Sequence, residues 1–141
     1  MARQPVCDSG ADNWRPGGWR LDSPRVALIR RLFERAERDD VESATEELLR
    51  HSAEDVVFYP HAAHGRAVRG HDAFREFWTR LAEEGTQIRA GAYSITEEGD
   101  TVVVTGWVRT TEKGRLADTQ SRWVFRFDDE GKVVSGGVER S

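Results

Sequence analysis

The spacing of apolar residues changes at Gly85, and this change constrains the fold more than any other feature of the sequence. Before it, apolar residues recur every three or four positions, as in helices; after it they alternate, as in strands. The alternating part divides into four segments, joined by the turn-forming sequences "EEGD", "EKGR" and "DDEGK". Such turns favour hairpins. We therefore expect residues 87–140 to form an antiparallel four-stranded meander.

Helical spacing dominates the part before Gly85, with one short strand inside it. Ser23-Pro24 is typical of a helix start, and the periodicity predicts a helix to about Arg38. Asp40 caps a second helix that ends near His51. "DVVFYP" predicts a strand stopped by Pro60, and "HDAFREFWTRLAEEG" a third helix. A loop with a short edge strand at 66–69 joins them. The fold class is α+β, with the helices on one face of a curved sheet.

The domain organisation is simple. Residues 1–22 have no apolar periodicity, and we expect them to form a flexible arm. Its two tryptophans, Trp14 and Trp19, have two possible roles: they pack on the domain or on a dimer partner, or they cover the mouth of a pocket. Residues 23–141 predict a single domain. A chain of 141 residues is large enough to bury a core without metals or disulfides.

Charge and cysteine content narrow the function classes. The net charge of −4 gives no support to a nucleic-acid surface. Cys7 is the only cysteine, which excludes an intrachain disulfide and a cysteine-rich zinc site. No apolar run reaches the roughly 18 residues of a membrane span, and the N-terminus lacks the apolar core of a secretory signal. We expect a cytoplasmic protein that binds neither nucleic acid nor membrane.

Two stretches resemble a known family. "AEDVVFYPHAAHGRAVRGHDAFREFW" and "RWVFRFDDEGKVVS" resemble SnoaL-like proteins of the nuclear transport factor 2-like superfamily, which includes ketosteroid isomerase. The resemblance covers residues 24 to about 140. It implies a cone: a curved sheet wrapped around helices, enclosing an apolar cavity, with a homodimer formed through the convex sheet face. We expect no cofactor. Because this fold hosts many activities, it does not by itself fix the function.

The implied cone gives each strand an inner and an outer face. In "RWVFRF", Trp123, Phe125 and Phe127 share one face, which we expect to line the core and cavity. In "TVVVTGWVRT" we expect Val102, Val104 and Val108 to point inward. Trp107 and Arg109 then point to the convex face, where both residue types suit an interface.

The catalytic groups of ketosteroid isomerase have no counterparts here. That enzyme uses an aspartate base, with a tyrosine and a protonated aspartic acid as the oxyanion hole. The resemblance puts Tyr59 at the position of the base and Trp123 at that of the second carboxyl group. Leu32 and Phe33 occupy the region of the tyrosine. Proton abstraction by a carboxylate is therefore disfavoured.

Tyr59 and His61 are the candidate catalytic residues that remain. If Tyr59 points into the cone, alternation along the strand also turns Val57 and His61 inward. A tyrosine–histidine pair could polarise a carbonyl or move a proton. The alternative is structural: Tyr59 packs in the core with its hydroxyl satisfied, and His61 caps a loop.

A metal site is less favoured. His61 and His64 could supply two ligands, but a zinc site needs three or four. Asp55, His71 and Asp72 could complete it only if the loop folded back. We expect no metal, with His64 and His71 as polar loop residues.

The expected pocket is aromatic and suits a flat, even polycyclic, apolar ligand. We expect its wall to include Phe33, Val57, Trp78, Trp123, Phe125 and, from the last strand, Arg140. The favoured function is a small-molecule enzyme of the polyketide cyclase, isomerase or dehydratase type, with Tyr59 and His61 as polar contacts. Two alternatives stay open: a dimeric module that binds a ligand without catalysis, and a protein-interaction domain.

Overall fold

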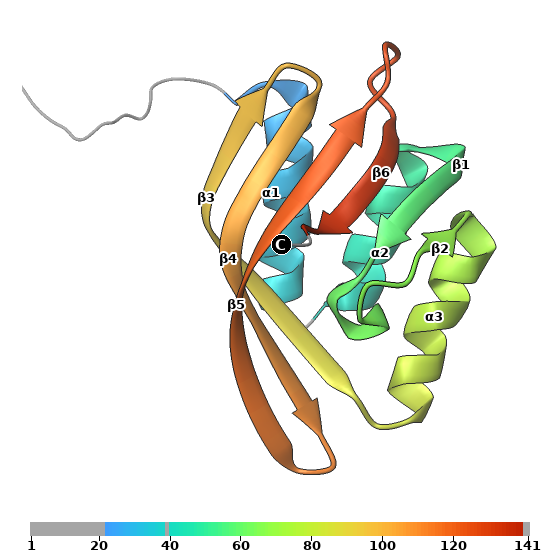
Figure 1. Cartoon of the computed structure of the whole chain (residues 1–141), viewed down its shortest axis with the longest axis vertical. Helices are drawn as coiled ribbons and strands as arrows, with labels where there is room; N and C mark the ends of the chain where they lie inside the picture. The colour runs from blue at the N-terminus through green and yellow to red at the C-terminus, as the bar shows by residue number, and fades with distance from the viewer. Residues whose placement is uncertain (1–21, 39, 140–141) are drawn as a thin grey trace, which may run out of the picture.

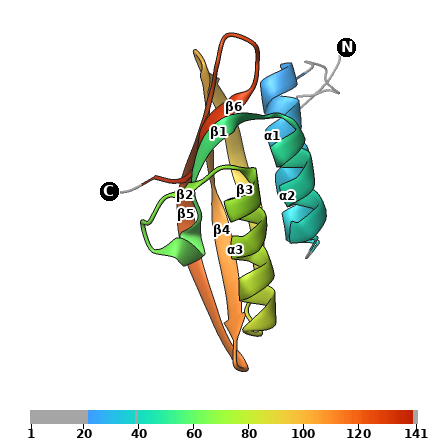
Figure 2. The same ribbon diagram turned by 90° about the vertical axis from the view of Figure 1, so that its right-hand side faces the viewer.

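The helices lie on one side of a single curved sheet (Figures 1 and 2). The structure, a computed structural model, describes residues 22–38 and 40–139. Its helices are α1 (Pro24–Glu37), α2 (Val41–Arg50) and α3 (His71–Glu83). Its strands are β1 (Ser52–Tyr59), β2 (Val68–Arg69), β3 (Gln87–Glu98), β4 (Thr101–Glu112), β5 (Arg115–Phe127) and β6 (Val133–Val138). The predicted α+β class and element order are confirmed.

Side-chain caps fix the starts of the first two helices, as the sequence predicts. The Ser23 hydroxyl accepts a hydrogen bond from the backbone N–H of Val26 at 3.2 Å, with Pro24 at the first helical position. The Asp40 carboxylate accepts one from Ser43 at 3.3 Å. Both caps pair backbone donors that have no partner within the helix.

The strands form one sheet in the order β2-β1-β6-β5-β4-β3. The meander β3–β6 is antiparallel throughout, as expected from its turn sequences. At the β4–β5 turn, Lys113 and Gly114 have φ values of 52° and 78°, the left-handed pair that a tight type I′ hairpin requires. The remaining long-range pairing, β1 against β6, is parallel. It brings Tyr59 at the end of β1 beside Gly137 of β6.

Alternation along β4 and β5 separates the inner from the outer face as predicted. Val102, Val104 and Val108 are at most 2% exposed, and Trp123, Phe125 and Phe127 are also buried. Trp107 and Arg109 lie half-buried on the other face. The core thus lies between the meander and the helices, where Ile29 of α1 and Leu49 of α2 are almost fully buried.

Three predicted features lie outside the described residues. These are the predicted arm over residues 1–22 with Trp14 and Trp19 (of which the structure describes only Asp22), the lone Cys7, and Arg140 as a pocket residue. Within the described part of the chain, no helix is long and apolar enough to cross a membrane.

Candidate functional site

A cavity of about 140 Å³, called the inner cavity below, lies between the sheet and the helices. Its wall draws on α1, α2, α3, β1 and the four strands of the meander. The wall is almost entirely apolar. Among the predicted pocket residues, the structure brings Phe33, Trp78, Trp123 and Phe125 together there, along with His61.

Aromatic rings pack against one another along two parts of this wall, edge to face around Phe33 and stacked on the side of α3. Phe33 contacts Trp123 with ring centroids 4.8 Å apart and an interplanar angle of 69°. Phe33 also meets Phe125, at 6.3 Å and 84°. On the side of α3, Phe74 stacks on Phe58 of β1 at 4.0 Å. Edge-to-face geometry places the positive rim of one ring on the negative face of the next, which gives these contacts a defined orientation. The wall is therefore aromatic on both sides of the cavity.

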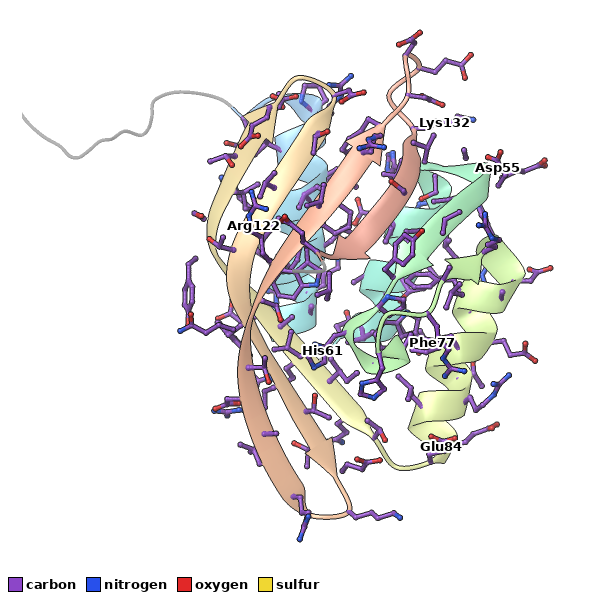
Figure 3. The ribbon with its side chains drawn as sticks, in the orientation of Figure 1. Asp55, His61, Phe77, Glu84, Arg122 and Lys132 are labelled. Atoms are coloured by element: carbon purple, nitrogen blue, oxygen red, sulfur yellow. The ribbon has the colours of Figure 1, made fainter. Side chains whose placement is uncertain are left out.

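His61 is the one titratable side chain among the described residues that line the inner cavity. Pro60 ends β1, and residues His61–Ala63 form a single 3-10 turn that directs the imidazole to the cavity. Figure 3 shows His61 near the centre of the molecule, whereas Glu84 and Lys132 lie at its periphery. Burial lowers the pKa of His61, and the nearby charge of His64 lowers it further. Near neutral pH the ring is thus held uncharged, with one nitrogen free to accept a proton.

The structure corrects the predicted orientation of Tyr59 and Val57. Phe58, not its neighbours, points inward and is 2% exposed. Tyr59 and Val57 are half-buried on the opposite face and do not line the inner cavity. His61 still reaches the cavity because the turn after Pro60 ends the strand alternation on which the prediction relied. Of the two candidate catalytic residues, His61 alone lines the inner cavity.

The other two candidate histidines have different surroundings. His64 is exposed and adopts the left-handed conformation, with φ 53°. A ring nitrogen of His71 lies 3.1 Å from the carbonyl oxygen of Ala53, which ties the start of α3 to β1. Across residues 22–38 and 40–139, no three His, Cys, Asp or Glu side chains come close enough together to hold a metal ion.

A second hollow, called the outer groove below, adjoins the inner cavity and was not predicted. It has a volume of about 500 Å³ and lies between α2, α3 and the start of β3. Its rim includes the exposed residues Glu42, Arg75 and Gln87. Trp78 belongs to the walls of both hollows. The apolar stripe of α3 indicates that Trp78 points inward, but only the packing of α2 and β3 around it reveals the second hollow.

Residues 29–136 match the SnoaL-like domain, and the chain therefore belongs to the SnoaL-like family. The fold is that of nuclear transport factor 2-like proteins and ketosteroid isomerase. The sequence has no significant match among proteins of curated function.

Three solved structures show the likeness of fold. An NTF2-like protein of unknown function from Burkholderia pseudomallei is 24% identical; the alignment covers 85% of this chain and 92% of that one, with a TM-score of 0.69. TerC, co-crystallised with polyporic acid, is 22% identical over 84% and 92% of the two chains, with a TM-score of 0.67. The Δ5-3-ketosteroid isomerase of a Mycobacterium species is 20% identical over 85% and 95%, with a TM-score of 0.64.

The cavity wall contains no Asp or Glu among the described residues. The three positions that resemble the catalytic positions of ketosteroid isomerase hold Tyr59, Trp123 and the Leu32–Phe33 pair. Trp123, Leu32 and Phe33 all contribute apolar surface to the wall. Any proton transfer in this cavity would therefore depend on a residue other than a carboxylate.

Proposed function

We propose that this protein is a small-molecule enzyme of the cyclase, isomerase or dehydratase type, which encloses an apolar ring-bearing substrate and moves a proton with His61. The observation that carries the proposal is the inner cavity, whose apolar wall holds a single titratable side chain. Membership of the SnoaL-like family supports it. The neighbour TerC, co-crystallised with polyporic acid, is in line with a small organic ligand.

The chemistry follows from an uncharged imidazole in an apolar enclosure. A neutral His61 can accept a proton from a carbon next to a substrate carbonyl and return it to another carbon, so that the protein ends unchanged. The surrounding rings exclude water and fix the orientation of the substrate, which promotes both isomerisation and ring closure. The lowered pKa of His61 keeps the imidazole in the proton-accepting form.

The size of the inner cavity limits what it can hold as it stands. An apolar cavity of about 150 Å³ accommodates one benzene ring. At about 140 Å³ the inner cavity has room for one six-membered ring, and it is smaller than the roughly 300–1,000 Å³ of typical ligand pockets. The expectation of a polycyclic substrate therefore does not fit the cavity in this conformation, and a one-ring substrate does.

The test is the isomerisation of 3-cyclohexen-1-one to 2-cyclohexen-1-one, a one-ring reaction in which a base removes a proton at C2 and returns it at C4. We expect wild-type protein to accelerate it and His61→Gln to abolish the acceleration while still binding the ketone. Tyr59→Phe is the matched control and should behave as wild type, since Tyr59 lies on the other face of β1. A rate that His61→Gln leaves unchanged would refute the role of His61.

The scarcity of polar groups in the wall favours a second candidate, a module that binds the same class of molecule without catalysis. The same experiment separates the two. Binding of 3-cyclohexen-1-one without acceleration by the wild type would favour the module. Absence of both binding and acceleration would refute both candidates.

We also propose a homodimer through the outer face of the meander. Tyr93 is 66% exposed and Leu116 is 58% exposed, although both are large and apolar. Tyr93, Trp107 and Arg109 border a shallow hollow on this face. Tyrosine, tryptophan and arginine are enriched in protein interfaces, so this composition suits a second copy of the chain.

A further inference from the structure

Trp78 forms part of the partition between the inner cavity and the outer groove. The two hollows share four lining residues, namely Val41, Thr45, Trp78 and Ile88. Of these, Trp78 has by far the largest side chain. The partition therefore depends mainly on the position of one indole ring.

The indole N–H of Trp78 is buried and has no hydrogen-bond acceptor within reach among the described residues. It is the only buried side-chain nitrogen or oxygen in this part of the chain that lacks a partner. An indole nitrogen can only donate, so no change of protonation relieves the defect. Buried polar groups are nearly always paired, and an unpaired one disfavours the conformation that contains it. The observed position of Trp78 is therefore one that a suitable acceptor would improve.

Trp78 is half-buried at the edge of the core. Its ring contacts are edge-on, to Phe74 at 5.9 Å and Phe77 at 5.2 Å, and both partners belong to α3 itself. Phe74 is the only buried residue of α3. Phe77 is half-buried and lines a surface hollow together with Ala63 and Val68. The aromatic contacts of the indole thus come from its own helix, and Trp78 packs half-buried against the edge of the core.

The volumes of the inner cavity and the outer groove show what a movement of Trp78 would change. The inner cavity, at about 140 Å³, holds one ring, whereas the adjoining groove has about 500 Å³. Rotation of Trp78 out of the partition would join them. The joined space would be large enough for a ligand of two fused rings, and Trp78 and Thr45 would line its middle.

The charges around the groove favour a neutral acceptor over an anion. Arg75 is already engaged: its guanidinium donates to both carboxylate oxygens of Glu46 at 2.8 and 3.1 Å, and to Asp72 at 3.3 Å. Glu42 and Glu46 line the same groove and repel a negative group. A ketone oxygen carries no net charge, so it needs no free arginine and the two glutamates do not repel it.

We propose that Trp78 is a movable wall and the recognition donor of this site: it swings aside to admit a two-ring ketone and then donates its N–H to the ketone oxygen. This inference rests on the proposed function, because it assumes that the inner cavity binds an apolar molecule. It adds the substrate class, an apolar bicyclic ketone, and a residue that determines specificity. It also restores a route by which the one-ring cavity takes a larger substrate.

The experiment is an NMR titration of the ¹⁵N-labelled full-length chain, which has five tryptophans and hence five indole N–H groups. The signal that Trp78→Phe removes is assigned to Trp78. The ligands are toluene, with one ring, tetralin, with two rings and no acceptor, and 1-tetralone, the same two rings with one ketone. We expect 1-tetralone to shift the Trp78 N–H proton downfield, and tetralin and toluene to shift it much less.

Affinities provide a second readout. The preference of the wild type for 1-tetralone over tetralin should fall about tenfold in Trp78→Phe, as the loss of one neutral hydrogen bond implies. Trp107→Phe, on the outer face of the sheet, is the matched control and should keep the wild-type preference. If Trp78→Phe does not fold, the shift in wild-type protein decides alone, with the signal assigned from sequential NMR connectivities.

The outcomes separate this inference from the proposed function. Two outcomes would refute the role of Trp78 and leave the apolar site in place. In one, 1-tetralone binds but the Trp78 signal does not shift. In the other, toluene binds and neither bicyclic compound does. If none of the three compounds binds, the apolar binding site is refuted, and the role of Trp78 falls with it.

Discussion

The ring of Phe125 lies directly over Gly136, on the inner face of the sheet. The two residues pair across β5 and β6, and a β-carbon added to Gly136 would stand 2.5 Å from Cδ1 of the ring. Both residues line the inner cavity. The absence of a side chain at position 136 thus lets the aromatic wall lie flat against the sheet.

Gly136→Ala should therefore push the Phe125 ring into the inner cavity. Real contacts of this kind are never as short as 2.5 Å, so the ring must move, and overpacking of this sort costs about 1–3 kcal/mol of unfolding free energy. We expect lower stability in urea and weaker binding of toluene. Ser135→Ala, the half-buried neighbour on β6, should change both little. Unchanged toluene binding by Gly136→Ala would show that Phe125 does not define the wall.

The faces of β4 and β5 could be predicted because their sequences distinguish them. In "RWVFRF" the aromatic residues alternate with two arginines, and burying Arg122 or Arg126 in place of Trp123 would be very unfavourable. The structure accordingly buries Trp123 and exposes both arginines. Only the orientation with the aromatic residues inward keeps both arginines out of the core, so the sequence alone predicted which face of β5 is buried.

β1 carries no such marker, and its orientation was predicted wrongly. Residues 56–59 read "VVFY", so both faces of the strand are apolar and alternation alone cannot choose between them. The prediction rested on the resemblance of Tyr59 to a catalytic position. The choice is made by long-range packing: Phe58 stacks on Phe74 of α3, a contact that the local pattern does not contain. The parallel pairing of β1 with β6 and the outer groove are long-range features of the same kind.

His61 should make the stability of the protein depend on pH. Burial, with a smaller effect of the nearby His64 charge, lowers the pKa of His61 in the folded state. The unfolded chain therefore binds a proton at this position more readily than the folded chain, and acidification favours unfolding. We expect the unfolding free energy of wild type, relative to His61→Gln, to fall as the pH drops below about 6.5, the ordinary histidine value. The fall should continue through the lowered folded-state pKa.

Urea unfolding of both proteins at a series of pH values measures this difference, and NMR titration of the His61 ring reports its pKa directly. A His64→Gln background removes the neighbouring charge and should raise the pKa of His61 slightly. A wild-type minus variant difference that stays level with pH would contradict the prediction.

Removal of Glu47 should lower the unfolding free energy less than removal of the two arginines that pair with it. The Glu47 side chain on α2 is 7% exposed and pairs with Arg31, at 3.0 Å, and with Arg35 on α1. Burial acts to raise the pKa of Glu47, but hydrogen bonding and charge from Arg31, with the charge of Arg35, outweigh it and hold the pKa below its usual value. The arginine side chains are 47% and 32% exposed, so water can hydrate them when Glu47 is absent.

Glu47→Gln should accordingly cost only about 1–2 kcal/mol of unfolding free energy, because it strands no buried charge. The double variant Arg31→Ala/Arg35→Ala leaves a buried carboxylate without a partner and should cost about 3–5 kcal/mol. Adding Glu47→Gln to the double variant should restore part of the loss. Chemical denaturation of the three variants measures this cycle, and equal losses for glutamate and arginine removal would argue against it.

Tyr93 should control association if the outer face of the meander forms a homodimer. Its side chain is 66% exposed, so Tyr93→Arg should leave the fold intact while placing a like charge opposite its copy across the interface. We expect light scattering after size exclusion to give twice the chain mass for the wild type. The dimer dissociation constant of the variant should be at least about tenfold higher than that of the wild type. Glu130→Arg, in the β5–β6 turn away from this face, controls for the change of charge and should stay dimeric. A wild-type chain that runs at its single-chain mass at every concentration would rule out the interface.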